Sequence, residues 1–362
     1  NSIDLQIFCS CKIAEISSQV LGRPLQPLLL SGPGMGKSSA VAMYAEIAGY
    51  ELVMLRGNST SPEVVQGFDV APSDTSKCHS TKHLRPTWFQ TVLDNHAKGK
   101  KTLLFLDEIS TANEFVQGSL LYLILERKCD QEPLPEDTLI ISAANYSNNL
   151  SNSMVMLPPL LNRFMLINII PTAKDLQHFL SYYDGSAISK RVDFKEEIKK
   201  KMEEMNNSGI DKELLENEDF LNKVGEMIEK AILDETVQLC REGSLDLGFS
   251  DLKDLYSEVE GKESLPGFIT MRTLNFARDM AISSYIAFGK AGLLSDNFKN
   301  QLTGLVGLAL SYVPKTGEVK KTLTTQRYAD ILAEVANDIE KMTCTGLKEY
   351  ENFFADILKK KG

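Results

Sequence analysis

The chain has 362 residues, of which 43% are hydrophobic and 24% are charged, a composition typical of a globular protein long enough for two domains. Its net charge of −10 disfavours free nucleic acid as a bulk partner, because phosphate backbones bind basic surfaces. No run of about twenty apolar residues and no secretory signal pattern are present, so the sequence predicts no membrane span and a cytoplasmic location.

Residues 4–20 place apolar side chains at helical spacing and predict an entry helix. The apolar run 28–30 then leads into SGPGMGKS at residues 31–38 and a helix-compatible stretch. This order of strand, small-residue loop and helix is typical of a phosphate-binding loop, whose backbone N–H groups and helix N-terminus attract a polyphosphate. Lys37 would neutralise the β- and γ-phosphates, and the Ser38 hydroxyl would ligate Mg²⁺.

One position departs from the usual pattern of this loop, since Ser31 stands where the first glycine is expected. Serine can serve there if the backbone keeps a negative φ. The alternative, a glycine-rich turn that binds nothing, gives no reason for a lysine at this spacing. The candidate nucleotide-binding residues of the loop and the first helical turn are Gly32, Pro33, Gly34, Met35, Gly36, Lys37, Ser38 and Ser39.

The segment TLLFLDE at residues 102–108 predicts a strand buried on both faces that ends in two carboxylates. Ligands of open α/β sheets bind at the carboxyl ends of the strands. Asp107 would therefore hold Mg²⁺, and Glu108 would orient and deprotonate an attacking water. An acidic helix cap after a core strand is the alternative.

Two later segments supply further polar candidates. The strand predicted at residues 139–144 ends at Asn145, whose amide would hold the attacking water or the γ-phosphate, with an ordinary turn residue as the alternative. A fourth strand is predicted at residues 164–170. Arg163 precedes it and would lie on the protein surface, away from its own nucleotide, with an ordinary surface arginine as the alternative.

The C-terminal half has a different composition. Residues 190–264 are rich in acidic side chains, and the apolar spacing from residue 214 to residue 232 predicts an amphipathic helix with one buried stripe. Residues 268–360 read as helical throughout, with a last helix at 344–361. We therefore expect an α/β core at 1–183, an acidic helical insertion or lid extension at 184–264, and a helical lid domain at 265–362.

The six cysteines are scattered and complete no zinc pattern, so the sequence predicts reduced thiols. A metal site formed by Cys78, His79 and His83 is the alternative.

Four elements follow one another in an order that resembles the AAA+ ATPases: the phosphate loop, the strand that ends in two carboxylates, the strand that ends at Asn145, and the turn that carries Arg163. Three further segments narrow the resemblance to the MoxR and dynein-related branch. Residues 107–127, DEISTANEFVQGSLLYLILER, resemble a Walker B motif leading into an LLxxLEER helix, and residues 157–164, LPPLLNRF, resemble LPxALxNRF. Residues 85–89, RPTWF, resemble a Pro-x-Trp element of some bacterial members. The resemblance covers about residues 26–181.

The resemblance implies a P-loop NTPase fold with a parallel sheet flanked by helices, followed by an all-helical lid and C-terminal region. It makes Asn145 the sensor 1 residue and Arg163 an arginine finger that reaches a neighbouring subunit in a hexameric ring. Arg272 is similar to sensor 2, although Met271 replaces the usual proline, and Arg278 is the alternative.

The region between residues 56 and 86 is rich in Ser, Thr, Pro and Gly, and a short helix at 62–66 and a hairpin near 69–83 are expected in it. Related proteins carry an insertion at this position that faces the central pore of the ring. The resemblance would therefore place Phe68 and Asp69 against a substrate, with a structural loop as the alternative.

The implied function is a MoxR-like ATPase that uses ATP and Mg²⁺ in a ring to remodel or activate a protein partner. In this family the partner commonly carries a von Willebrand factor A domain. One alternative is a GTP- or ATP-driven motor subunit of a restriction or helicase-like complex that processes nucleic acid. Another is a nucleotide-gated assembly scaffold with little turnover, against which the intact pair of Asp107 and Glu108 argues.

Overall fold

The computed structural model describes residues 3–71, 81–145, 156–169, 217–241, 271–295 and 323–345, with a few single residues between these ranges. Its centre is a five-stranded sheet in the order β2-β5-β8-β1-β9, and every neighbouring pair in it is parallel. The parallel sheet expected from the alternation of strands and helices is confirmed. Its strands are β1 (Pro27–Ser31), β2 (Tyr50–Arg56), β5 (Lys101–Asp107), β8 (Leu139–Asn145) and β9 (Met165–Asn168).

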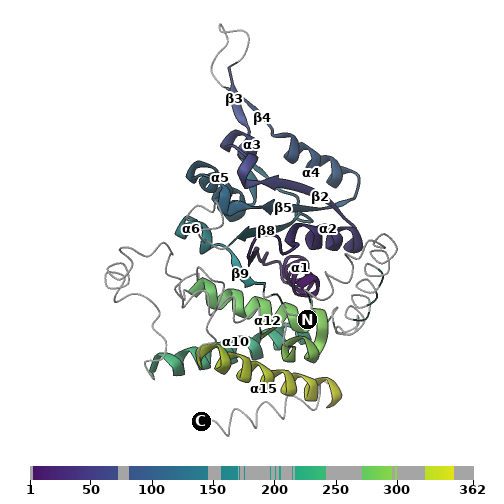
Figure 1. Cartoon of the computed structure of the whole chain (residues 1–362). Helices are drawn as coiled ribbons and strands as arrows, with labels where there is room; N and C mark the ends of the chain where they lie inside the picture. The colour runs from purple at the N-terminus through teal and green to yellow at the C-terminus, as the bar shows by residue number, and fades with distance from the viewer. Residues whose placement is uncertain are drawn as a thin grey trace, which may run out of the picture.

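Helices cover both faces of the sheet (Figure 1). One face packs against α1 and α2, and the other against α3, α4 and α5, because successive side chains of a buried strand point to opposite faces. Leu29 belongs to the first core and Leu28 and Leu30 to the second. The helices are α1 (Ile3–Gln19), α2 (Lys37–Ala48), α3 (Pro62–Gln66), α4 (Thr87–Ala97), α5 (Glu114–Glu126) and the short α6 (Pro158–Leu161).

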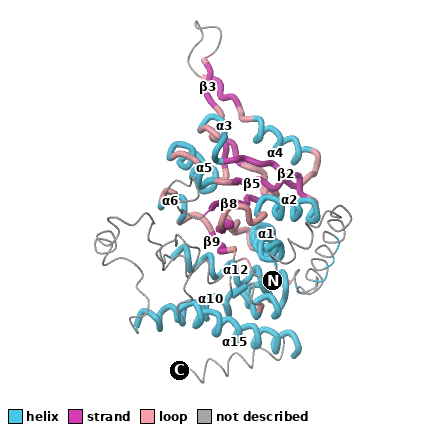
Figure 2. The backbone as a smooth tube through the Cα atoms, in the orientation of Figure 1, coloured by secondary structure: helices cyan, strands magenta, loops and turns pink. Residues whose placement is uncertain are grey.

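Two small antiparallel pairs of strands stand apart from the main sheet. The ribbon formed by β3 (Phe68–Val70) and β4 (Lys82–Leu84) projects away from the helical part of the molecule (Figure 2). The hairpin formed by β6 (Lys128–Cys129) and β7 (Glu132–Pro133) follows α5. The short helix expected at residues 62–66 is confirmed as α3, and the strands expected near residues 69–83 are confirmed as β3 and β4.

The C-terminal part that the structure describes is helical and lies below the sheet (Figure 1). Its helices share a hydrophobic core with α1 and with one face of the sheet. The stripe predicted on α10 is confirmed, since Phe220, Val224, Ile228 and Ile232 are all buried. The last helix expected at 344–361 lies outside the described residues, except for its first two. The three helices are α10 (Glu218–Arg241), α12 (Met271–Leu294) and α15 (Leu323–Thr345).

None of the described helices combines the length and the apolar character needed to cross a bilayer. Cys9, Cys11 and Cys129 are free and buried. No group of three or more metal-binding side chains gathers among the residues that the structure describes. Cys78 and His79 of the alternative metal site lie outside them, and His83 is hydrogen-bonded to Asp69 and to the carbonyl of Gln66.

Candidate active site

The phosphate loop connects the end of β1 to the start of α2. Gly34 and Gly36 have φ angles of 75° and 76°, a left-handed conformation that disfavours residues with a Cβ. Gly36 caps α2, so the unpaired N–H groups and the positive end of the helix dipole lie at the loop. Ser31 keeps the extended backbone of β1, which meets the condition for replacing the usual glycine.

Lys37 connects the loop to the neighbouring strand β8. Its Nζ donates hydrogen bonds to Asn145 Oδ1 at 2.8 Å, to Ser31 Oγ at 2.7 Å and to the Gly32 carbonyl at 3.2 Å. Asn145 pairs in register with Ser31, which explains how Lys37 meets a side chain 108 positions further along the chain. Burial lowers the pKa of Lys37 to about 8, while the negative charges of nearby carboxylates oppose that change.

Ser38 and Asp107, the two residues predicted to bind a metal, lie together in the site. The Ser38 hydroxyl donates to Asp107 Oδ2 at 2.6 Å, and Asp107 Oδ1 accepts from the backbone N–H of Glu108 at 2.9 Å. A hydroxyl and a carboxylate at this separation are both hard oxygen ligands, which suit Mg²⁺. Magnesium usually takes only one or two protein ligands and completes its shell with phosphates and water, so this pair fits the expected ion.

Glu108 is held in an unusual backbone conformation beside Asn58, a side chain that the motifs in the sequence do not identify. The φ of Glu108 is 52°, which is uncommon for a residue other than glycine. Asn58 Nδ2 donates to Glu108 Oε2 at 2.8 Å. A Cβ on Gly57 would lie 2.4 Å from the Glu108 carbonyl oxygen, so the glycine permits this close approach. The signal for Asn58 was its place just after the apolar strand β2, by the same reasoning that identified Asp107.

A pocket of about 160 Å³ lies where these elements meet. It brings together all the residues predicted for phosphate, metal and water, apart from Gly32, whose carbonyl contacts Lys37 instead. Neither Arg163 nor Arg272 is among its lining residues, which are Pro33, Gly34, Met35, Gly36, Lys37, Ser38, Ser39, Asp107, Glu108, Ala144 and Asn145.

The structure places Arg163 and Arg272 beside each other. Arg272, in the first turn of α12, donates from Nη1 to the Asn162 carbonyl at 3.2 Å. Burial lowers the pKa of Arg272, and the positive charge of Arg163 lowers it further. The Nε of Arg163 is buried and has no hydrogen-bond partner among the described residues. The Arg163 side chain, which was expected on the surface, is half-buried, and Arg272 of α12 contacts the carbonyl of the preceding residue in the same turn.

Arg278, the alternative to Arg272, is engaged elsewhere. Its Nε donates to Asp279 Oδ1 at 2.9 Å, and Nη1 lies 3.5 Å from Glu229 Oε2 of α10. Asp279 also accepts from Arg23 at 3.3 Å. These contacts give Arg278 a structural role between helices. In contrast, the Nε–H of Arg163 has no acceptor within the described part of the chain.

The match to a known family agrees with this geometry. Residues 27–182 match the model of the AAA domain, dynein-related subfamily. No curated protein matches the chain in sequence. Among matching solved structures is the crystal structure of a "putative ATPase" from Cytophaga hutchinsonii, with 13% identity and a TM-score of 0.47, over 91% of this chain and 87% of that one.

The family match covers the described strands from β1 to β9, and the phosphate loop, the two carboxylates and Asn145 all lie within it. Residues 27–182 therefore form an AAA domain of the dynein-related subfamily, which places this part of the chain among the AAA+ ATPases.

Proposed function

We propose that this protein is a MoxR-like, Mg²⁺-dependent ATPase that works in a ring and uses hydrolysis to remodel or activate a protein partner. The observation that supports it best is a pair of contacts across the pocket. Lys37 Nζ lies 2.8 Å from Asn145 Oδ1, and Ser38 Oγ lies 2.6 Å from Asp107 Oδ2. Phosphoryl transfer to water requires a lysine that binds the phosphates, oxygen ligands that bind a cation, and a nearby carboxylate that activates the water.

Each residue has a role in this proposal. Lys37 and the N–H groups at the start of α2 bind the β- and γ-phosphates, and Ser38 and Asp107 hold Mg²⁺, which would neutralise charge that develops on the phosphate oxygens. Glu108 orients the attacking water and accepts its proton at the carboxylate. Asn145 holds that water or the γ-phosphate from the side, and Asn58 holds the carboxylate of Glu108 in position.

The two adjacent arginines support a site that is completed between subunits. The positive charge of Arg163 lowers the pKa of Arg272, so an anion bound near both guanidinium groups would relieve their repulsion. Neither lines the pocket of its own subunit. We therefore assign both Arg163 and Arg272 to the nucleotide of a neighbouring subunit, where an arginine finger can be worth roughly 10³ to 10⁵ in rate.

The ribbon β3–β4 is our candidate for contact with the remodelled partner. Phe68 is 51% exposed and pairs in register with the exposed Leu84. Asp69 is not available in the same way, because its carboxylate contacts His83. A partner with a von Willebrand factor A domain and a cytoplasmic location are part of this proposal; the partner rests on the family resemblance, and the location rests on the sequence.

The first experiment is Mg²⁺-dependent ATP hydrolysis at several protein concentrations, with GTP in parallel. We expect a specific activity that rises with protein concentration, because the site needs a second subunit. Turnover that is independent of concentration down to a verified monomer would contradict the trans arrangement. Assembly without turnover would instead support the nucleotide-gated scaffold, and activation by DNA or RNA would support the nucleic-acid motor.

A further inference from the structure

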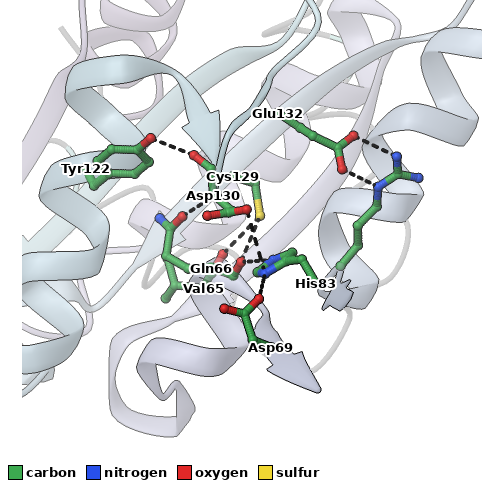
Figure 3. A network of polar contacts seen from close by, with 9 residues as sticks. Val65, Gln66, Asp69, His83, Tyr122, Cys129, Asp130 and Glu132 are labelled. Atoms are coloured by element: carbon green, nitrogen blue, oxygen red, sulfur yellow. Dashed lines mark hydrogen bonds and ion pairs between the residues drawn. The ribbon is translucent and has the colours of Figure 1, made fainter. Parts of the chain in front are cut away.

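The ribbon β3–β4 and the hairpin β6–β7 are joined by charged side chains at the base of the ribbon. His83 of β4 lies between Asp69 of β3 and Asp130 at the tip of the β6–β7 hairpin (Figure 3). Two positions further along the chain, Arg85 makes a two-bonded contact with Glu132 of β7, with both N···O distances at 2.7 Å. The contacts of His83 and Arg85 follow one another along both segments, and we call this row of charged contacts between the ribbon and the hairpin the seam.

Both ring nitrogens of His83 face acceptors. Nδ1 lies 3.0 Å from Asp69 Oδ1 and 3.7 Å from Asp130 Oδ2, and Nε2 lies 2.9 Å from the carbonyl oxygen of Gln66. A neutral imidazole carries one N–H only, so either tautomer would leave a lone pair directed at an oxygen lone pair. Only the protonated ring donates at both nitrogens, and the arrangement therefore favours the imidazolium ion.

We propose that protonated His83 is a latch that holds the ribbon β3–β4 against the hairpin β6–β7, and that the ribbon loosens when His83 loses its proton. The latch needs no nucleotide, so it is independent of the proposed ATPase activity. Its effect on a partner held by the ribbon rests on the proposed function. The contact between Arg85 and Glu132 keeps the seam from opening completely, because an arginine stays charged at every accessible pH.

The backbone around the latch allows close contact. Gly67 has a φ of 84°, and a Cβ placed on it would lie 2.5 Å from His83 Nε2 and 2.3 Å from the Leu84 carbonyl oxygen. A glycine at this position lets the imidazole reach the carbonyl at the end of α3. The local backbone thus permits the short contact between His83 Nε2 and the Gln66 carbonyl, which requires an N–H at Nε2.

The other charged and titratable groups of the seam favour the same state. Asp69 faces the ring from β3 and Asp130 from the hairpin, and with the Gln66 carbonyl they raise the pKa of His83, the hydrogen bond to Asp69 having the largest effect. Cys129 stays a neutral thiol, since burial raises its pKa to about 12. The positive charge of Arg85 is matched by Glu132. Among the described residues, the net charge that faces His83 is negative.

The latch reaches α5, the helix that follows the catalytic carboxylates in the chain. Gln66 Oε1 accepts from the backbone N–H of Asp130 at 2.7 Å, and its Nε2 donates to the Ser119 carbonyl of α5 at 3.0 Å. Tyr122 of α5 donates to the Asp130 carbonyl at 2.6 Å (Figure 3). Asp130 is therefore held from α3 and α5 at once, so the hairpin gives His83 a fixed anchor.

The direction of the pH dependence follows from the raised pKa. A group whose pKa is higher in the folded ribbon stabilises it fully below the unfolded pKa of about 6.5, and this contribution is lost as pH rises through the folded value. The ribbon is thus expected to be most protected in mildly acidic solution.

The test is amide hydrogen exchange of the nucleotide-free full chain from about pH 5.5 to about pH 9, corrected for the intrinsic exchange rate. We expect the protection of residues 68–70 and 82–84 that protonated His83 supplies to be lost as pH rises through the folded pKa of His83. His83→Gln should remove this dependence, since glutamine can donate to one acceptor but does not titrate. Asp130→Asn should move the transition to lower pH.

His96→Gln is the matched control, because His96 on α4 also faces a carboxylate, Asp137 at 3.1 Å, but lies outside the seam. It should keep the wild-type dependence. Corrected protection in the unaltered protein that does not change with pH, or a change that persists in His83→Gln, would overturn the latch. Because no nucleotide is present, failure here would leave the proposed ATPase function untouched, and an inactive ATPase site would not affect this result.

Discussion

At the scale of single residues, the proposed function makes the carboxylate of Glu108 the group that hydrolysis needs and nucleotide binding does not. Glu108 and Asp107 both line the pocket, but Asp107 also accepts a hydrogen bond from the hydroxyl of Ser38, the proposed metal ligand. Glu108→Gln should therefore keep ATP affinity within about threefold and lower kcat by about 10² to 10⁴, the usual contribution of a general base. Single-turnover kinetics with equilibrium binding would separate the two effects. Glu114→Gln, an exposed carboxylate on α5, is the control, and wild-type turnover in Glu108→Gln would reject the assignment.

The hydrogen bond from Asn58 makes a second prediction at this scale. Because Asn58 Nδ2 orients Glu108 Oε2 at 2.8 Å, Asn58→Ala should lower kcat by about tenfold through misplacement of the base, with nucleotide affinity unchanged. Steady-state and binding measurements on this variant and on Ser59→Ala, its neighbour in the same turn, would check it. An unchanged kcat would mean that Glu108 is positioned by its backbone alone.

At the scale of elements, Glu15 ties the entry helix to the sheet and to the helix behind the phosphate loop. Tyr44 of α2 and Tyr50 of β2 donate to its two oxygens, both at 2.9 Å, and Lys12 lies at the same distance. Burial raises the pKa of Glu15, but the charge of Lys12 and these hydrogen bonds outweigh burial, so the pKa lies below its usual value.

Glu15→Gln should therefore lower the free energy of unfolding by about 1–3 kcal/mol at neutral pH. Because a lowered carboxylate pKa stabilises above the unfolded value and is lost as pH falls through the folded value, the difference between the two proteins should shrink below about pH 4.5. Urea unfolding at several pH values would measure this. Glu126→Gln, an exposed carboxylate, should change little, and a pH-independent difference for Glu15→Gln would contradict the assignment.

At the scale of the whole molecule, the position of Arg163 and Arg272 outside the pocket predicts complementation between inactive subunits. Arg163→Ala retains its own pocket, and Glu108→Gln retains its arginines, so each should be inactive alone. A mixture should recover a substantial fraction of wild-type hydrolysis, because some interfaces then combine an intact pocket with an intact Arg163. ATPase assays at fixed total protein would test this. No recovery, despite verified mixed assembly, would place Arg163 in the site of its own subunit.

Much of the pocket was predictable from the sequence, because its residues lie at the ends of apolar strands in contiguous motifs. Parallel strands bring their carboxyl ends to one edge, so Ser38, Asp107, Glu108 and Asn145 meet there once the strands are recognised. The amphipathic stripe of α10 was predictable for a similar reason, since the helical period alone decides which side chains share a face. The division into three domains and the roles assigned to the arginines stay predictions.

The sequence by itself determined the nucleotide-binding motifs, because the residues of the phosphate loop and the two carboxylates lie close together within short segments of the chain. Only the tertiary structure decided that Asn58 holds Glu108, that Arg272 lies beside Arg163, and that His83 meets Asp130. Each of these contacts joins two segments that are distant in the chain, and no repeating pattern in the sequence indicates that they meet. They depend on how the ribbon, the hairpin and α12 pack against the sheet, and that packing is set by burial of apolar surface over the whole fold rather than by any motif.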